Sequence, residues 1–206
     1  MIELLVNTFI ILFVVIDPVG LAPMFAALTH GEPRAYRRRM AIKGTLLAAA
    51  VLFAFMFAGG RLLGALGIGL PAFRIAGGVL LFLLAIDMVF ARHSGLRSTT
   101  VREQEEAEHK KDISVFPLAI PLIAGPGAIT TVLLMSGGRP SAATLAVLAA
   151  VLAGVLAVTL LSLLAAARLV AWLGETGTNV ITRTLGVVLA ALAVQFVTDG
   201  LRASLA

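Results

Sequence analysis

Six long apolar runs are the feature that most limits what this chain can fold into. A helix that crosses the hydrocarbon core of a bilayer needs roughly 20 mostly apolar residues. The runs cover about 4–29, 42–63, 71–91, 113–136, 142–167 and 181–198. Of the 206 residues, 60% are apolar and 13% are charged, whereas about a quarter of the residues of a soluble domain are charged. The sequence therefore predicts an all-α, polytopic membrane protein with a bundle of six transmembrane helices.

The basic residues predict which way the bundle faces. Connectors at one side of the predicted bundle (30–43, 92–112 and 168–183) hold twelve of the 16 Lys and Arg. By the positive-inside rule this side is cytoplasmic, so both termini face the periplasm or the cell exterior. We expect a multi-pass membrane protein. Because the basic residues lie in connectors between spans, they argue against a nucleic-acid surface.

The N-terminal run is predicted to be retained. A cleaved secretory signal begins with a basic region and has a short apolar core. Here the start is Met1-Ile2-Glu3, and the apolar run reaches Leu28. We therefore expect the first run to be a permanent span.

An acid and a proline interrupt this first span, in the stretch FVVIDPVGLAPMF at residues 13–25. An acidic side chain at membrane depth is costly, and a proline removes an amide donor and disfavours helix at the residue before it. Proline is nevertheless common as the first residue of a helix, and aspartate is a good N-cap. The motif Asp17-Pro18-Val19-Gly20 therefore predicts the end of one half-helix and the capped start of another.

The fourth span carries a similar break, and the two breaks belong to a wider internal similarity. IDPVGLAP at 16–23 resembles IAGPGAITT at 123–131, and FRIAGGVLLFLL at 73–84 resembles TRTLGVVLAALA at 182–193, with nearly the same offset. Because each copy has an odd number of spans, the second copy must cross the membrane in the opposite sense, as in many secondary transporters. We expect two inverted three-helix repeats, residues 1–91 and 113–206, joined by a charged cytoplasmic linker at 92–112.

Two interrupted spans suggest a binding site near the middle of the membrane. Irregular backbone survives at that depth only where it is buried in protein or lines a cavity. The starts of two half-helices would direct unpaired amides at a carboxylate, and Asp17 could hold an ammonium group, Na⁺ or a proton. The predicted site residues are Asp17, Pro18, Val19, Gly20, Gly125, Pro126, Gly127, Ala128, Thr130, Thr131 and Gln195.

A purely structural interpretation of these residues stays open. Proline kinks occur in transmembrane helices without any ligand, and Asp17 could serve only as the cap of its own helix. Gln195 lies deep in the sixth span, where it either lines a pathway or bonds a neighbouring helix.

Other kinds of chemistry have little support in the sequence. There is no cysteine, so disulfides and thiol chemistry are excluded. The three histidines lie in connectors without the spacing of metal ligands, and the motifs of zinc proteases, serine hydrolases and P-loop enzymes are absent. We expect a protein that is not an enzyme and has no cofactor other than a coupling ion.

Taken in order, DPVGLAP, FRIAGGVLLFLLAIDM, PLIAGPGAIT and AVQFVTDG resemble the MarC/NAAT family of prokaryotic inner-membrane proteins along essentially the whole chain. Leu21 departs from the family pattern, in which an asparagine is often expected. The resemblance implies a small six-span transporter in a superfamily of amino-acid exporters, some of whose relatives look like carriers of small neutral amino acids. It also implies that the Asp17-Pro18-Val19-Gly20 and Gly125-Pro126-Gly127-Ala128 motifs form the functional core.

The predicted function is a carrier or exporter of small neutral amino acids, coupled to Na⁺ or H⁺, that works by alternating access. Its expected partners are the bilayer and a small-molecule substrate, and a homo-oligomer stays open. The alternatives are an inorganic-ion exporter or channel, which predicts acids or histidines converging inside the membrane, and a membrane scaffold without transport. The scaffold predicts that side chains fill the breaks.

Overall fold

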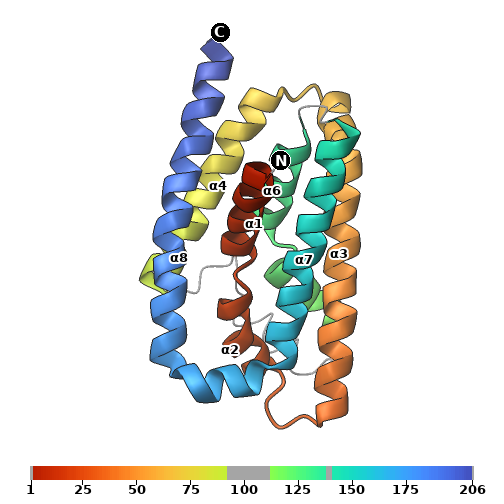
Figure 1. Ribbon diagram of the computed structural model, residues 1–206, viewed down its shortest axis with the longest axis vertical. Coiled ribbons are helices and arrows are strands. Elements are labelled where there is room, and N and C mark those ends of the chain that lie inside the picture. The colour runs from red at the N-terminus through yellow and green to blue at the C-terminus, as the bar shows by residue number, and fades with distance from the viewer. Residues whose placement is uncertain (1, 92–111, 138–140, 206) are drawn as a thin grey trace.

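The computed structural model describes residues 2–91, 112–137 and 141–205, and every element in these ranges is helical (Figure 1). The elements are α1 (Ile2–Ile16), α2 (Pro18–Leu28), α3 (Arg34–Ala65), α4 (Leu70–Phe90), η1 (Ser114–Ile123), α6 (Pro126–Ser136), α7 (Ala142–Leu164) and α8 (Ala166–Leu205). Two predicted connectors lie largely outside the described residues. They are the charged linker at 92–112, of which only Asp112 is described, and the connector between the fourth and fifth spans, of which residues 138–140 are not described. The all-helical prediction is confirmed.

Five stretches of the described chain are long and apolar enough to cross a membrane. They are Ile2–Leu28, Arg34–Ala65, Leu70–Phe90, Ala142–Leu164 and Thr176–Leu205. The pair η1 and α6, bent by 57°, makes a sixth stretch if it counts as one span. These stretches overlap the apolar runs of the sequence, and both termini lie toward the same end of the bundle (Figure 1).

The predicted linker between the fifth and sixth spans is largely helical. The stretch 168–179 was expected to be a linker, but α7 ends at Leu164 and α8 runs from Ala166 to Leu205, with a sharp change of direction at Gly174 (φ 66°, ψ 175°). Arg168 and the polar residues after Gly174 lower the average hydropathy, yet alanine, leucine and arginine are strong helix formers. The first part of α8 therefore forms a short helical arm across the end of the bundle before the span begins (Figure 1).

α4 and α8 form the most extensive helix pair and run antiparallel. Gly200 of α8 lies against Pro71 at the start of α4, and Gly186 lies against Met88 near its end. A methyl group added at Gly200 would lie 2.9 Å from the Pro71 carbonyl oxygen. Such close backbone contact, permitted by small residues, is typical of helix pairs in membranes.

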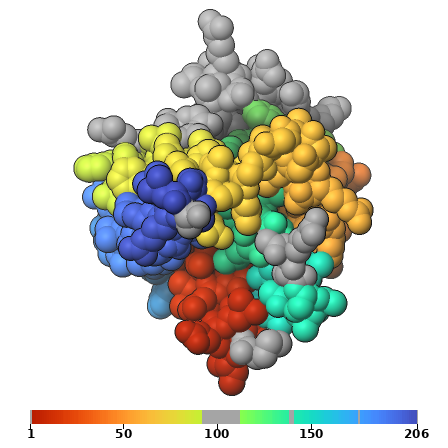
Figure 2. Space-filling view, turned by 90° about the horizontal axis from the view of Figure 1, so that it is seen from above, coloured from red at the N-terminus to blue at the C-terminus, as the bar shows by residue number. Residues whose placement is uncertain are grey.

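α6 occupies the middle of the molecule. Seen from the end that carries the termini, it lies between α1 and the pair α3 and α4 (Figure 2). Most of its residues are buried, including Ala128, Val132 and Leu133. The second break therefore lies inside the bundle rather than on its periphery.

The two halves of the chain have matching elements. α2 and α6 have 11 residues each. The start of α6 follows the start of α2 by a fixed number of residues. The same number of residues separates the ends of these two helices, and it also separates the start of α3 from the start of α7. The packing is exchanged between halves, because α2 packs on α7 and α8 of the second half whereas α6 packs on α3 and α4 of the first.

Candidate functional site

The first break is a single residue wide. α1 ends at Ile16 and α2 begins at Pro18, and Asp17 between them adopts the left-handed conformation (φ 49°, ψ 69°). Aspartate is one of the few residues with a side chain that tolerates this region. Pro18 then begins α2 without needing a hydrogen-bond partner, since proline has no amide N–H.

The carboxylate of Asp17 is completely buried and bridges two parts of the chain. Its Oδ1 accepts a hydrogen bond from the Gly20 amide at 3.0 Å, which caps α2. Its Oδ2 accepts a hydrogen bond from the Thr182 hydroxyl of α8 at 3.3 Å. Asp17 is thus both a helix cap and a contact between the first break and the last span.

Thr182 is a residue of this cluster that sequence reasoning missed. It lies beside Arg183, at the start of the TRTLGVV motif that matches the third span. Its place in this motif was the only sequence signal for a role at the site. A threonine in a membrane helix does not by itself indicate a partner on another helix, because its hydroxyl commonly bonds its own backbone. Nothing in the sequence says that Thr182 faces an acid in the first span.

Gly20 permits the close contact between Asp17 and α2. A methyl group added there would lie 2.8 Å from the Asp17 Cγ and 2.8 Å from the Thr182 Oγ1. The carboxylate therefore occupies the space in which any other residue would place its Cβ. Val19, the other residue of the predicted motif, is half-buried in the first turn of α2.

The second break is wider and has no side-chain cap. In η1, Phe116 and Ile120 have extended backbone, and each precedes a proline. η1 then meets α6 at 57°, and Gly125, which precedes Pro126, makes no capping hydrogen bond through a side chain. The first turn of α6 therefore presents backbone amides without the carboxylate that occupies the corresponding position in α2.

The two breaks lie next to each other. A methyl group added at Gly127, the second residue of α6, would lie 3.6 Å from Val15 Cγ1, and Val15 is two residues before Asp17. The same position would lie 2.8 Å from the Leu84 side chain of α4. Segments from different halves of the sequence are thus brought together in the interior of the bundle.

The remaining predicted site residues divide into two groups. Ala128 and Thr131 are buried in α6 beside the second break, and the Thr131 hydroxyl donates to the Gly127 carbonyl at 2.9 Å. Thr130 is buried against Gly77 of α4. Gln195 does not join them, because its side chain is on the exposed face of α8, where it donates to Asp199 at 2.8 Å.

The part of the chain that the structure describes contains no group of three or more His, Asp or Glu side chains that could hold a metal ion. Within that part, Asp17 is the only acidic residue in the buried class. A cation at this position would therefore have one carboxylate, with hydroxyl and carbonyl oxygens as its other ligands. Such a set suits a monovalent ion or a proton better than a transition metal.

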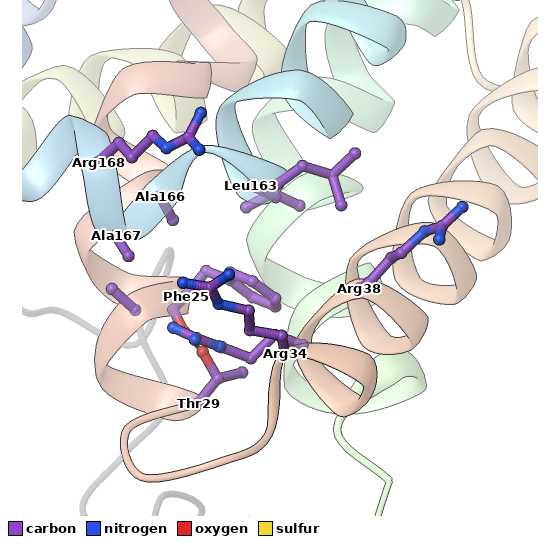
Figure 3. A pocket seen from close by; sticks show the side chains of 11 residues that line it. Phe25, Thr29, Arg34, Arg38, Leu163, Ala166, Ala167 and Arg168 are labelled. Atoms are coloured by element: carbon purple, nitrogen blue, oxygen red, sulfur yellow. Dashed lines mark hydrogen bonds between the residues drawn. The ribbon is translucent and has the colours of Figure 1, made fainter.

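A cavity of about 380 Å³ lies away from the breaks, at the other end of α2. Its lining comes from the end of α2, the start of α3 and the junction of α7 and α8. Four arginines border it: Arg34, Arg37, Arg38 and Arg168 (Figure 3). This arginine pocket is a second polar feature, and no sequence motif predicted it as a site.

Comparison with known proteins identifies the family. Residues 2–205 match the MarC family integral membrane proteins. This chain belongs to the MarC family. It is 38% identical over 202 residues to the membrane protein YvbG of Bacillus subtilis, which covers 98% of this chain and 96% of YvbG. The comparison with solved structures found no match.

Two further relatives support the same assignment. A membrane protein of Archaeoglobus fulgidus is 39% identical over 196 residues, covering 94% of this MarC family chain and 90% of the relative. The inner membrane protein YhgN of Escherichia coli K12 is 34% identical over 199 residues, covering 96% of each chain. The predicted family is confirmed, and the protein is an integral, multi-pass membrane protein.

Proposed function

We propose that this MarC family protein is a secondary transporter of small neutral amino acids, with its site at the two adjacent helix breaks. The observation that carries the proposal is the position of Asp17, which is fully buried in the first break, two residues after Val15, whose side chain lies against Gly127 of the second break. A buried acid and two interrupted spans each cost stability, and in membrane proteins such features typically mark a substrate or ion pathway.

The proposed architecture is a pair of inverted three-helix repeats that span the membrane six times. The constant offset between matching helix bounds, the exchanged packing and the antiparallel pair α4 and α8 support it. An axis in the membrane plane would relate the two halves. The arginine-rich end is then cytoplasmic and both termini are outside, in agreement with the distribution of basic residues.

The two breaks would bind opposite ends of the substrate. The Asp17 carboxylate, with the Thr182 hydroxyl, takes the ammonium group or the coupling Na⁺ or proton. The first turn of α6 takes the carboxylate, because its amide end has no side-chain cap at Gly125 and carries the positive end of the helix dipole. Gly20 and Gly127 leave little room for side chains, which favours glycine, alanine, serine or threonine as substrates.

Transport in this scheme requires Asp17 to become accessible. It is completely buried in the structure, so the arrangement corresponds to a closed form of the site. Rocking of one three-helix unit against the other would open the breaks alternately to each side.

The two rival functions make different predictions. An inorganic-ion exporter or channel needs acids or histidines gathered inside the bundle, and the described residues offer only one buried acid. A scaffold needs breaks that are closed by their own side chains, and the cap that Asp17 provides to α2 is compatible with that. Transport measurements separate the scaffold from the carrier.

The direct test is flux in vesicles that contain the purified protein. Labelled glycine, alanine, serine and threonine are offered with and without a sodium gradient and with and without a pH gradient. We expect flux of at least one of these amino acids that rises with one gradient and is lost in Asp17→Asn. If none of these amino acids is transported but an inorganic ion is, the proposed substrate class is wrong and the protein is an inorganic-ion transporter.

A further inference from the structure

The arginine pocket brings together cationic residues from two distant parts of the chain. Arg34, Arg37 and Arg38 come from the first turns of α3, and Arg168 comes from the first turn of α8. In the close-up, Arg34 lies near Phe25 and Thr29 of α2, with Arg168 across the pocket (Figure 3). Like charges held at one cavity repel one another unless an anion offsets them.

No described carboxylate provides that anion. Among the residues that the structure places, the one ion pair joins Lys43 to Asp112, and neither residue lines the pocket. The acid nearest in sequence to the pocket arginines of α3 is Glu32, an exposed residue of the turn between α2 and α3. Glu32 does not line the pocket either. Within the described ranges, the guanidinium groups are thus available to an external anion.

The rest of the lining is apolar and lies at the ends of spans. Phe25 and Leu163 are buried at the pocket, 2% exposed each. Leu164, which also lines it, is 46% exposed, and Leu161 on the same outer side of α7 is 64% exposed. An anion bound here would therefore have apolar surface beside it that continues onto the outside of the bundle.

Taken together, these features match the chemistry of a phospholipid at the membrane surface. Guanidinium groups bind phosphate through paired N–H donors, and basic pockets between helices on the cytoplasmic side are suited to anionic headgroups. The apolar lining and the exposed leucines of α7 would contact the glycerol backbone and an acyl chain, which a free phosphate ion lacks.

We propose that the arginine pocket is a binding site for a phosphate group, supplied by an anionic phospholipid of the leaflet at the arginine-rich end. The bound lipid holds the end of α2, the start of α3 and the junction of α7 and α8 together. It lies at the end of α2 opposite to Asp17, so it is distinct from the proposed transport site. This inference does not depend on what the protein transports.

The test uses the full-length protein in detergent, with four separate additions: phosphatidylglycerol, phosphatidylcholine, inorganic phosphate and free alanine. The readouts are the midpoint of thermal unfolding and the number of lipids retained in native mass spectrometry. We expect phosphatidylglycerol to raise the midpoint and to bind about tenfold more tightly than phosphatidylcholine. Stabilisation by inorganic phosphate as well would support the phosphate site with a soluble ligand as its source.

Two variants with the same change of charge separate the pocket from general surface charge. In Arg37→Gln a residue of the pocket is lost, whereas Arg39→Gln removes an exposed arginine on the same helix that does not line it. We expect Arg37→Gln to lose most of the preference for phosphatidylglycerol and Arg39→Gln to keep it. If Arg37→Gln does not fold, Arg37→Lys retains the charge without the paired donors and should bind the lipid several-fold more weakly than the wild type.

The proposal is overturned if neither phosphatidylglycerol nor phosphate stabilises the protein more than phosphatidylcholine does. It is also overturned if Arg39→Gln loses the lipid preference as fully as Arg37→Gln, because the effect would then reflect net charge. Stabilisation by free alanine that depends on Arg37 would assign the pocket to a carboxylate ligand and likewise contradict the proposal.

Discussion

The break at Asp17 and the break at Gly125 occupy matching positions, yet their chemistry differs. At the first, one residue in a left-handed conformation places a carboxylate over the first turn of α2. At the second, a longer irregular segment leads to a glycine, and α6 begins without a side-chain cap. A carboxylate thus caps the helix that follows the first break, whereas only backbone groups lie at the start of the helix that follows the second.

This difference indicates how a duplicated scaffold can bind an asymmetric ligand. Two identical breaks would offer the same group twice, whereas these offer a carboxylate at one break and uncapped amides at the other. The acid near the start of the second half, Asp112, is exposed and lies before the span begins. A zwitterion fits such a pair of half-sites because its two charged ends have opposite sign.

The largest effect is expected for Asp17→Asn, which removes the charge but retains a good N-cap. Gradient-driven amino-acid flux should fall by about two orders of magnitude or more, because the ammonium group or coupling ion loses its counter-charge. The free energy of unfolding should change by no more than ~1 kcal/mol. Flux and thermal unfolding are measured on the same preparation. Normal flux in Asp17→Asn would show that the acid serves only as a helix cap.

A smaller loss is expected for Gly20→Ala, which places a methyl group where the carboxylate lies. Overpacking of this kind costs about 1–3 kcal/mol, and displacement of the carboxylate should also reduce flux. Gly154→Ala in α7 is the matched control, because no neighbouring atom lies within 4 Å of its added methyl group. That control should be neutral or slightly stabilising, since alanine is the better helix former. Equal behaviour of the two variants would remove the role given to Gly20.

At the second break, Gly127→Ala tests whether the two breaks depend on close contact. The added methyl group would lie 2.8 Å from the Leu84 side chain and 3.6 Å from Val15. Because the nearest atom is the end of a flexible leucine, we expect a cost of only ~1 kcal/mol in unfolding free energy and a partial loss of flux. A loss as complete as that of Asp17→Asn would mean that the second break contributes as much as the first.

The smallest effect concerns Asp112, the exposed acid that directly precedes the second half. Its hydrogen bond with Lys43 lowers the pKa of the Asp112 carboxyl to about 2, with a further contribution from Ser114. Because the folded pKa is lowered, the added stability is present above the ordinary value of 3.8 and is lost as the pH falls from there to about 2. The pair is almost half exposed, so the contribution should stay below ~1 kcal/mol.

Thermal unfolding of Asp112→Asn and wild type across this acidic range checks the sign. The two proteins should differ above about pH 4 and converge toward about pH 2. A difference that grows as the pH falls would contradict the assigned direction.

Much of the fold could be predicted from the sequence because membrane spans and proline breaks have strong local signals. The spans, the breaks at Asp17 and Gly125 and their matching positions in the two halves were all readable from residue type and spacing. The helical arm before Gly174 was missed, because a few polar residues hid a stretch of good helix formers. The stretch was expected to connect two spans, but its helical conformation was not predicted.

The site was predictable only where the chain itself marks it. Asp17 and Gly127 carry visible defects in their helices, so their importance could be inferred. Thr182, which bonds Asp17, and Gln195, which faces outward, could not be assigned, because both depend on how α8 is rotated against its neighbours. The arginine pocket likewise needs the fold, because Arg168 reaches it from a different half of the chain.

If the two breaks open to form a substrate site, their residues become accessible to reagents in water, and the absence of native cysteine allows this to be tested directly. A single cysteine in Val19→Cys, in the first turn of α2, is labelled with a maleimide in vesicles with and without alanine. We expect slow but measurable labelling that alanine inhibits, while the control Ser141→Cys outside the breaks reacts equally in both conditions. No labelling of Val19→Cys under any gradient, or labelling that no small neutral amino acid affects, would contradict the proposed substrate site.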